Sequence, residues 1–105
     1  SWSGTTNQGN PISFDVAHSP DCEVQNLTIR YRVTCSWGSY WTATTEFYSD
    51  YAITNDSFDT GGDTPRVQGD FASTTSANGT WSYNGYNPYN PGEYCSSSGT
   101  WTASP

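Results

Sequence analysis

The stretch that most limits what this chain can fold into runs from Val24 to Trp37. Within it, apolar side chains take every second position from Leu27 onward, and Thr, Arg or Ser stands between them. This period-two alternation is typical of a β-strand with one buried and one solvated face. The apolar set consists of Leu27, Ile29, Tyr31, Val33, Cys35 and Trp37. At about 3.3 Å per residue the strand crosses a whole small domain, so we expect the rest of the chain to cover its apolar face.

Two neighbouring segments show the same alternation. Pro11–Ala17 alternates Ile, Phe and Val with Ser, Asp and Ala, and Pro at its start suits the beginning or the edge of a strand. After the long strand, Gly38-Ser39 is the signal of a two-residue type II′ hairpin. The return strand, Tyr40–Tyr48, then brings Glu46 to a position where it can face an arginine across the hairpin. A turn over His18–Asp21 separates the first strand from the long one.

The second half of the chain has shorter strand signals. Asn78-Gly79 is a strong type I′ turn signal, and it joins a strand that starts at Val67 to one over Thr80–Tyr83. A loop rich in Tyr, Asn and Pro over Asn84–Gly92 and then a Ser-rich turn precede the last strand, Thr100–Ala103. No segment shows helical periodicity. Seven or eight short strands with regularly spaced turns predict an all-β, antiparallel two-sheet β-sandwich of the immunoglobulin-like or jelly-roll type.

Length and composition determine the domain organisation. A chain of 105 residues closes a single core, and with eight Tyr and five Trp that core is built largely from aromatic side chains. We expect the β-sandwich domain over residues 11–105. Residues 1–10 are polar apart from Trp2. We interpret them as an extended N-terminal arm that stays flexible or orders only against a partner.

The charge of the chain excludes two classes of partner. Ten acidic residues against three basic ones give a formal net charge of −7. Phosphate backbones repel such a chain, so we expect no nucleic-acid partner. An anionic lipid surface is disfavoured for the same reason. No apolar run is long enough to span a bilayer, so we expect no membrane insertion.

Three cysteines indicate a secreted protein in an oxidising compartment, with one disulfide. If the long strand is continuous, Cys22 and Cys35 lie roughly 40 Å apart along it, whereas a disulfide needs Cα atoms within about 7 Å. Cys95 therefore bonds one of them, and we favour Cys35 because both lie in alternating aromatic strands near the expected core. Cys22 is then free or bonded to another molecule. The alternative is that all three cysteines are reduced and act as small hydrophobic residues.

The sequence offers no catalytic site. Its single histidine, His18, is close to Ser19 and Asp21 in sequence, but neither a nucleophile elbow nor a metal-binding histidine pair is present. Nothing singles out two of the ten acidic residues as the carboxylate pair of a glycoside hydrolase. We therefore expect a non-catalytic protein without a cofactor.

Two kinds of surface site have weaker signals. Asp56, Asp59 and Asp63 surround a Gly pair and are candidate oxygen ligands for calcium. Asp and Gly are also ordinary turn residues, which is the interpretation we favour. Formal N-glycosylation sequons, which a chain rich in Asn, Ser and Thr also contains by chance, begin at Asn26, Asn55 and Asn78.

The segment Asn84–Tyr94 has the composition of a recognition loop. Tyr offers a rigid amphipathic face and Asn offers adaptable hydrogen bonds, which suits sugar rings or a protein surface, including a second copy of this chain. The alternative is a proline-stiffened loop that folds back over the core. The candidate contact residues are Tyr86, Asn87, Tyr89, Asn90 and Tyr94, together with Trp2 in the arm.

Two of the three basic residues, Arg30 and Arg32, take adjacent outward positions in the long strand. We expect them to pair with carboxylates on neighbouring strands, such as that of Glu46. The alternative is that they bind an acidic ligand or a neighbouring subunit.

Several segments of strand and turn residues together resemble a loosely defined group of secreted bacterial β-sandwich surface domains. They are the strand that ends in Cys35, then Val67-Gln68-Gly69-Asp70-Phe71, Ala77-Asn78-Gly79-Thr80-Trp81, and Cys95 followed by Gly99-Thr100-Trp101-Thr102-Ala103. The similarity covers most of the chain from Ile12 onward. It implies the sandwich fold, secretion and the disulfide between Cys35 and Cys95. It implies no activity, and Cys22 lies outside the pattern.

Two functions from different classes fit the sequence. The first is a structural subunit of an extracellular fibre, filament or similar surface assembly of identical copies, in which the N-terminal arm adds a strand to the sheet of the next copy. The second is a carbohydrate-binding module of a secreted enzyme or adhesin, motivated by the surplus of Tyr and Trp. We favour the assembly, because the carbohydrate-binding interpretation leaves Cys22 and the arm unexplained.

Overall fold

The computed structural model describes residues 1–18 and 22–105, so the part of the expected turn over residues 19–21 lies outside the described residues. The described residues form nine β-strands with antiparallel pairing, which confirms the all-β antiparallel prediction. The strands are β1 (Trp2–Thr6), β2 (Pro11–Ala17), β3 (Glu23–Thr34), β4 (Tyr40–Glu46), β5 (Tyr51–Ala52), β6 (Ser57–Asp59), β7 (Arg66–Ser73), β8 (Ser76–Asn87) and β9 (Asn90–Ser104).

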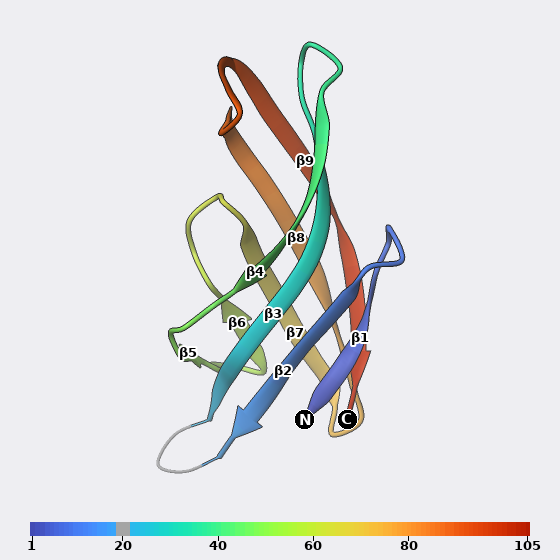
Figure 1. Cartoon of the computed structure of the whole chain (residues 1–105). Coiled ribbons are helices and arrows are strands. Elements are labelled where there is room, and N and C mark those ends of the chain that lie inside the picture. The colour runs from blue at the N-terminus through green and yellow to red at the C-terminus, as the bar shows by residue number, and fades with distance from the viewer. Residues whose placement is uncertain (19–21) are drawn as a thin grey trace.

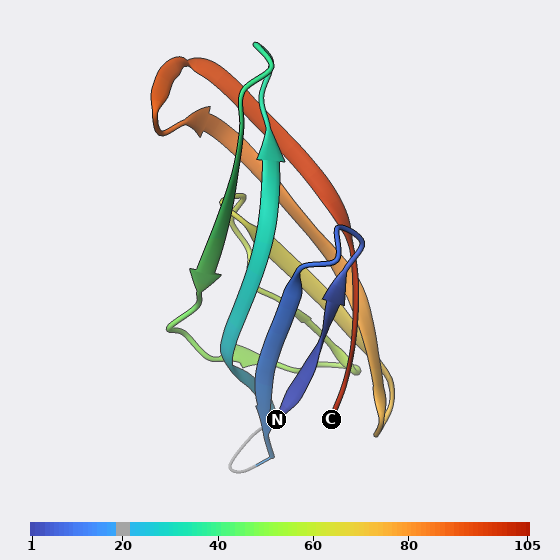
Figure 2. The same cartoon turned by 45° about the vertical axis from the view of Figure 1, so that its right-hand side comes forward.

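The strands belong to one sheet in the order β4-β3-β2-β1-β9-β8-β7-β6, and β5 pairs with β3 outside this path. This sheet curls, so that β2 and β3 lie over β7 and β8 (Figures 1 and 2). The ring centroids of Phe14 on β2 and Phe58 on β6 are 6.1 Å apart, and those of Tyr31 on β3 and Trp81 on β8 are 5.8 Å apart. The core therefore lies inside the curl of a continuous sheet, and a division into two separate sheets is not shown.

The alternation of the long strand is confirmed over β3. Its odd residues from Leu27 to Val33 are at most 2% exposed and point into the core. β4 follows the same rule, and Trp41 and Ala43 on its inner side pack against that core. The two strands pair over the whole length of β4, which places the inner faces of both on the same side of the sheet.

The turn between β3 and β4 is longer than the expected two residues. The Cys35 amide donates a hydrogen bond to the Ser39 carbonyl at 2.8 Å, so these two residues close the turn. Gly38 has a φ of +89°, the left-handed conformation that a three-residue hairpin loop uses. Trp37 lies in the turn and is 64% exposed, which corrects its expected place on the inner face.

Residues 1–10 do not form an arm in this structure. β1 lies inside the sheet, paired with β2 on one side and with β9 on the other. Gly4 allows this fit, because a Cβ there would lie 1.7 Å from the carbonyl oxygen of Thr102. Trp2, expected as a contact residue of the arm, stacks half-buried on Phe14 with 5.8 Å between the ring centroids. β1 thus joins the β2–β3–β4 half of the sheet to the β9–β8–β7 half.

The loop after β1 holds this strand in place from both sides. The Asn7 side-chain oxygen accepts hydrogen bonds from Trp81 Nε1 at 3.2 Å and from the Thr100 amide at 3.1 Å. The side-chain amide of Gln8 donates to the Arg32 carbonyl at 3.0 Å and accepts from the Arg32 amide at 2.8 Å. Asn7 therefore bonds to β8 and β9, while Gln8 bonds to β3.

β8 and β9 form one long hairpin, which corrects three expectations. Asn78-Gly79 lies within β8, because the chain turns earlier, between Ser73 and Ser76. The expected loop over Asn84–Gly92 is mostly strand, and only Pro88-Tyr89 separates β8 from β9. The Ser-rich segment is also strand, because β9 continues through it without a turn.

The sequence Gly-Thr-Trp occurs twice, and its two copies pair with each other across β8 and β9. Gly79 lies opposite Trp101, and Trp81 lies opposite Gly99. A Cβ on Gly79 would come within 2.8 Å of the Trp101 ring, and one on Gly99 within 2.6 Å of Trp81 Nε1. Each buried indole therefore covers the glycine across from it, so the repeat marks the register of the two strands.

Candidate interaction surfaces

The β3–β4 turn and the β8–β9 turn lie at the same end of the molecule (Figure 1). Exposed aromatic residues belong to these turns and to the strand ends beside them. The Cys35–Cys95 disulfide joins the end of β3 to β9 and confirms the expected pairing. Beside it, the Ser36 amide donates to the Tyr94 carbonyl at 2.9 Å. This surface, referred to below as the aromatic end, consists of side chains that are 46–81% exposed, namely Trp37, Tyr40, Tyr86, Tyr89 and Tyr94.

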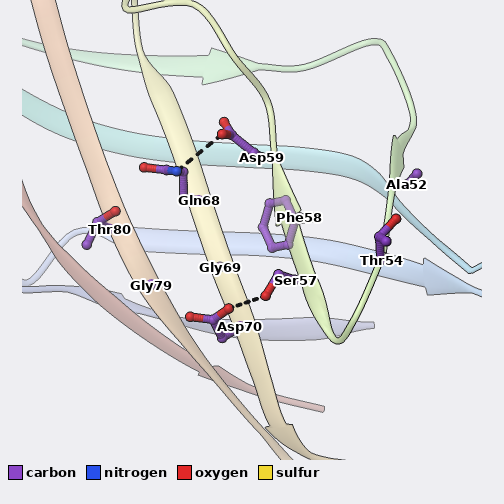
Figure 3. A pocket seen from close by; sticks show the side chains of 10 residues that line it. All are labelled: Ala52, Thr54, Ser57, Phe58, Asp59, Gln68, Gly69, Asp70, Gly79 and Thr80. Carbon is purple, nitrogen blue, oxygen red and sulfur yellow. Dashed lines mark hydrogen bonds between the residues drawn. The ribbon is translucent and has the colours of Figure 1, made fainter.

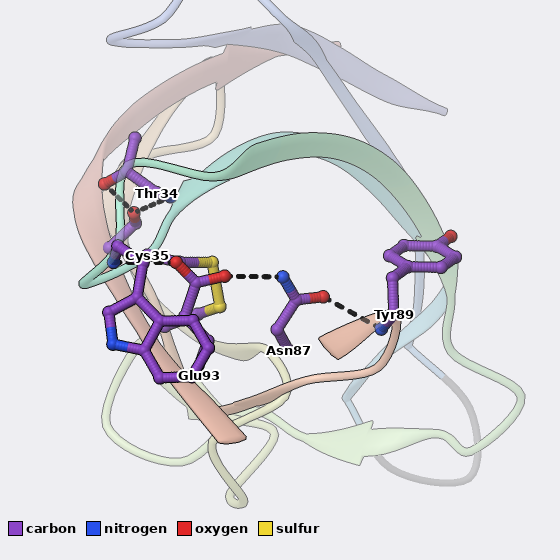
Figure 4. The surroundings of a disulfide bond; sticks show 8 residues. Thr34, Cys35, Asn87, Tyr89 and Glu93 are labelled. Atoms are coloured by element: carbon purple, nitrogen blue, oxygen red, sulfur yellow. Dashed lines mark hydrogen bonds between the residues drawn. A yellow bond between two sulfur atoms is a disulfide. The ribbon is translucent and has the colours of Figure 1, made fainter. Parts of the chain in front are cut away.

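A buried carboxylate supports the aromatic end from inside. Glu93 has no exposed surface, and it accepts hydrogen bonds from the Trp37 amide at 2.7 Å and from the Asn87 side chain at 2.9 Å (Figure 4). Burial by itself raises the pKa of Glu93, but hydrogen bonds from Asn87, Ser39 and the Trp37 amide outweigh it and lower the pKa below its ordinary value. The ionised carboxylate therefore ties the two turns together.

The predicted contact residues of Asn84–Tyr94 divide into two groups. Tyr86 and Tyr94 face each other across β8 and β9, edge to face, with 5.4 Å between the ring centroids. Tyr89 and Asn90 are also exposed. Asn87 is only 4% exposed, because its side chain points inward to Glu93 and accepts a hydrogen bond from the Tyr89 amide (Figure 4). Asn87 therefore supports the surface and is not the contact residue that we expected.

β4 is an open edge of the sheet (Figure 2). At the two ends of the β3–β4 ladder, the Cys35 amide donates to Ser39 and the Phe47 amide donates to Leu27. Because antiparallel bonding alternates, the odd residues of β4 bond to β3, and the amides and carbonyls of its even residues point away from the sheet. β4 contains no Pro, Gly or basic residue, and Glu46 is its only charge. Apart from this one charge at its end, β4 lacks the features that usually protect an edge from pairing with another strand.

Arg30 and Arg32 point outward beside this edge, but they do not pair as expected. Thr28 lies opposite Glu46, where an arginine was predicted. Within residues 1–18 and 22–105, neither arginine takes part in an ion pair. The Arg32 guanidinium lies over the Tyr40 ring instead, 4.1 Å from its centroid. In the described part of the chain, both positive charges therefore lack a carboxylate partner.

A polar groove of about 630 Å³ lies along β6 and β7 (Figure 3). The carboxylates of this groove are already bonded. Nη2 of Arg66 lies 2.5 Å from Oδ2 of Asp59, and this contact lowers the pKa of Asp59 to about 2. Asp70 accepts a hydrogen bond from the Ser57 hydroxyl. In the part of the chain that the structure describes, no three His, Cys, Asp or Glu side chains form a group that could hold a metal ion. The calcium candidates Asp56, Asp59 and Asp63 are therefore not brought together.

Cys22 is an exposed free thiol at the start of β3, so one cysteine is left over as expected. Its sulfur lies 3.7 Å from Nδ1 of His18. Both side chains line an apolar cavity of about 420 Å³, together with Trp2 and Phe71. The thiol can therefore be reached from solvent and by another molecule.

The three sequons lie on the surface. Asn26, Asn55 and Asn78 are all exposed. The side-chain amide of Asn26 donates to an Asp15 carboxylate oxygen at 2.9 Å, and Asn55 has a φ of +52° in the turn before β6. Glycosylation at these positions stays a prediction.

Two features of these surfaces were not expected from the sequence. The open edge has a signal that can be recognised afterwards, since Tyr40–Thr45 lacks any charge, Pro or Gly. Glu93 also has a sequence signal, because it stands two residues before Cys95 and alternation along a strand places both residues on the inner face. A buried acid is rare without partners, however, and its partners come from turns that sequence alone does not bring together.

Comparisons with protein-family models, with curated proteins and with solved structures found no match. Among residues 1–18 and 22–105, no helix is long and apolar enough to cross a membrane. A functional assignment must therefore come from the surfaces of the chain itself.

Proposed function

We propose that this chain is a non-catalytic structural domain of an extracellular assembly, such as a bacterial surface fibre, in which copies join by strand addition. The observation that carries the proposal is the open edge β4. Four of its seven residues turn their amides and carbonyls away from the sheet. Main-chain bonding across such an edge needs little side-chain specificity.

The other end of the sheet differs from β4 in the way expected of a protected edge. β6 has three residues, carries Asp59 and lies just before the Gly61-Gly62 pair. Short length and charge are usual ways to prevent edge pairing. β1, which we first expected to be the donor strand, has both of its edges occupied by β2 and β9. Strand addition is therefore assigned to β4.

Cys22 supplies a second junction in this proposal. Its exposed thiol can form a disulfide with Cys22 of another copy, releasing two protons and two electrons to an extracellular oxidant. A β4 contact and a Cys22 contact that alternate along a row of copies make a linear polymer. As part of the same proposal, the chain is related to secreted bacterial β-sandwich domains of the immunoglobulin-like or jelly-roll type. The Cys35–Cys95 disulfide fits that relationship.

The test is the size of the native protein before and after the edge is blocked. Thr44→Pro removes an amide that points away from β3, so it closes the edge without breaking the ladder to β3. We expect light scattering and electron microscopy to show oligomers or filaments for the wild type. Thr44→Pro should give nothing larger than Cys22-linked pairs, which reductant should convert to single copies. Reductant should shorten the wild-type filaments by opening the Cys22 junction.

Two controls separate edge pairing from other effects. Thr44→Lys should also give single copies in the presence of reductant, because a lysine on the edge disfavours pairing. Thr80→Lys adds the same charge to an exposed position of the inner strand β8 and should assemble normally. A monodisperse wild-type protein near 11.5 kDa, with and without reductant, would contradict the proposal.

A carbohydrate-binding module is the second candidate, and the Tyr86–Tyr94 pair favours it. Both rings are exposed on the outer side of a hairpin that a disulfide and Glu93 hold in place, and sugar rings stack on such faces. Affinity electrophoresis in gels that contain neutral polysaccharides tests this function. Retention of the wild type that Tyr86→Ala abolishes would support it, and equal mobility of wild type and variant in every gel would exclude it.

A further inference from the structure

We propose that the strand added at the open edge is β4 of a second copy, antiparallel about a two-fold axis at Ala43, and that Arg32 of each copy pairs with Glu46 of the other. This inference rests on the proposed function, and it adds the identity of the partner, the register and the charges that select them.

The available backbone groups of β4 restrict the register, and full overlap of the two strands selects one of the registers that remain. The amides and carbonyls of its even residues point to the open side. Full antiparallel overlap of Tyr40–Glu46 with its own copy places Tyr40 opposite Glu46 and Thr42 opposite Thr44, so available groups meet available groups. Ala43 lies opposite itself on the axis. A shift by one residue would oppose available groups to bonded ones and exchange the two faces of the strand.

The same register brings together charges that lack partners in the single chain. Arg32 lies over the Tyr40 ring, and Tyr40 is the residue that meets Glu46 of the second copy. Arg32 lies opposite Thr42, two residues along the strand from the position opposite Tyr40. With adjacent strands about 4.8 Å apart and about 3.4 Å per residue, the backbones of Arg32 and of Glu46 on the added strand are about 12 Å apart, a span that the two side chains bridge together. Two symmetric ion pairs result in each dimer.

Within its own chain, Glu46 forms no ion pair in the described residues. It lies opposite Thr28, and one of its carboxylate oxygens accepts a hydrogen bond from the Tyr48 hydroxyl at 3.2 Å. The whole chain has a formal net charge of −7, so two copies repel each other at long range. A contact that places arginine against glutamate offsets that repulsion at the edge.

Arg30 provides a control that matches Arg32 in charge, strand and face. It lies on the same strand and the same outer face, opposite Thr44. In the proposed register Thr44 meets Thr42 of the second copy, so Arg30 meets no acid. Reversing its charge changes the net charge by the same amount as reversing that of Arg32.

The experiment measures self-association by sedimentation velocity in a Cys22→Ser background, which removes the thiol junction. We expect Arg32→Glu and Glu46→Arg each to weaken dimerisation by about tenfold or more, because each places like charges together. Equimolar mixing of the two variants should restore the dimer, since each copy then offers the charge that the other needs. Arg30→Glu should change the association much less, and high salt should weaken the wild-type dimer.

The outcomes distinguish this inference from the function on which it rests. A wild type that stays a single copy at every concentration overturns both. A wild type that assembles, is blocked by Thr44→Pro and responds equally to Arg30→Glu and Arg32→Glu keeps edge pairing but overturns the register. Failure of the mixed variants to associate overturns the ion pair.

Discussion

Glu93 shows how a single buried charge can hold two turns together. Its carboxylate accepts hydrogen bonds from the Trp37 amide and the Asn87 side chain, and the first of these joins residues that are 56 positions apart in the chain. An ionised carboxylate inside a protein is stable only when such donors surround it. The aromatic side chains that cover it are therefore held by a charge that the solvent does not reach.

The first prediction concerns the pH dependence of this contact. Hydrogen bonds lower the pKa of Glu93 in the folded state, so its stabilising contribution is present above the unfolded pKa, about 4.3, and is lost as the pH falls through the folded value. We expect Glu93→Gln to melt at a lower temperature than the wild type at pH 7. Differential scanning calorimetry should show this gap closing in acid.

Glu23→Gln is the control, because it makes the same change of charge on a carboxylate at the start of β3. We expect its melting temperature to stay near that of the wild type across the same pH range. A difference in melting temperature between Glu93→Gln and the wild type that is independent of pH would contradict this prediction. It would mean that the charge of the carboxylate does not join the two turns.

Among the elements, β1 is the one that sequence reasoning misplaced most. Its residues are small and polar apart from Trp2, and they lack the alternation that identified β2 and β3. A strand with small residues at its centre is needed there because β9 passes so close to Gly4. Local sequence shows the faces of a strand but not its neighbours, so the alternation of β2, β3 and β4 was recognised whereas the place of β1 was not.

The second prediction tests how closely β1 fits between its neighbours. A Cβ on Gly4 would lie 1.7 Å from a backbone oxygen of β9, and no rotation of a side chain can relieve that contact. We expect Gly4→Ala to lower the free energy of unfolding by about 1–3 kcal/mol, measured by urea denaturation. Ser3→Ala, at the exposed neighbouring position, should leave it nearly unchanged. Equal urea midpoints for both variants would place β1 outside the sheet.

The β8–β9 hairpin shows a different limit of sequence reasoning. Asn78-Gly79 has strong turn propensity, yet it lies within a strand because the pairing of Gly79 with Trp101 outweighs the local preference. The two Gly-Thr-Trp segments indicate this register, because the Gly of each lies opposite the Trp of the other. It becomes informative only when the two copies are considered as partners on adjacent strands, and sequence spacing alone does not show that they are adjacent.

At the scale of the whole molecule, two links join the halves of the curled sheet in addition to the hydrogen bonds of Asn7, Gln8 and Glu93. One is β1, and the other is the disulfide at the aromatic end. Distance along β3 excluded a bond between Cys22 and Cys35, and strand alternation near the core favoured Cys35 over Cys22 as the partner of Cys95. The curl of the sheet was not predictable, since alternation assigns residues to an inner face without showing whether that face packs against a second sheet or against another part of the same sheet.

The third prediction concerns the disulfide. It closes a loop with a sequence separation of 60 residues, and loss of a crosslink over such a loop costs about 4 kcal/mol of unfolding free energy in the chain-entropy model. We expect urea denaturation of Cys22→Ser to show this loss on addition of reductant. A Cys22→Ser/Cys35→Ala/Cys95→Ala variant should match the reduced protein and ignore reductant. No shift on reduction would show that β1 and the core hold the halves together without the crosslink.

The position of the terminal strands has a mechanical consequence. Ser3 lies opposite Ser104, so β1 and β9 run antiparallel and both ends of the chain leave the molecule side by side (Figure 1). A force that separates these ends loads the hydrogen bonds between them one after another, as in a zipper, and they give way at low tension. The peeling then reaches Cys35 and Cys95, beyond which the enclosed loop cannot lengthen. Under load, the chain would stretch early, over a limited distance, and then resist.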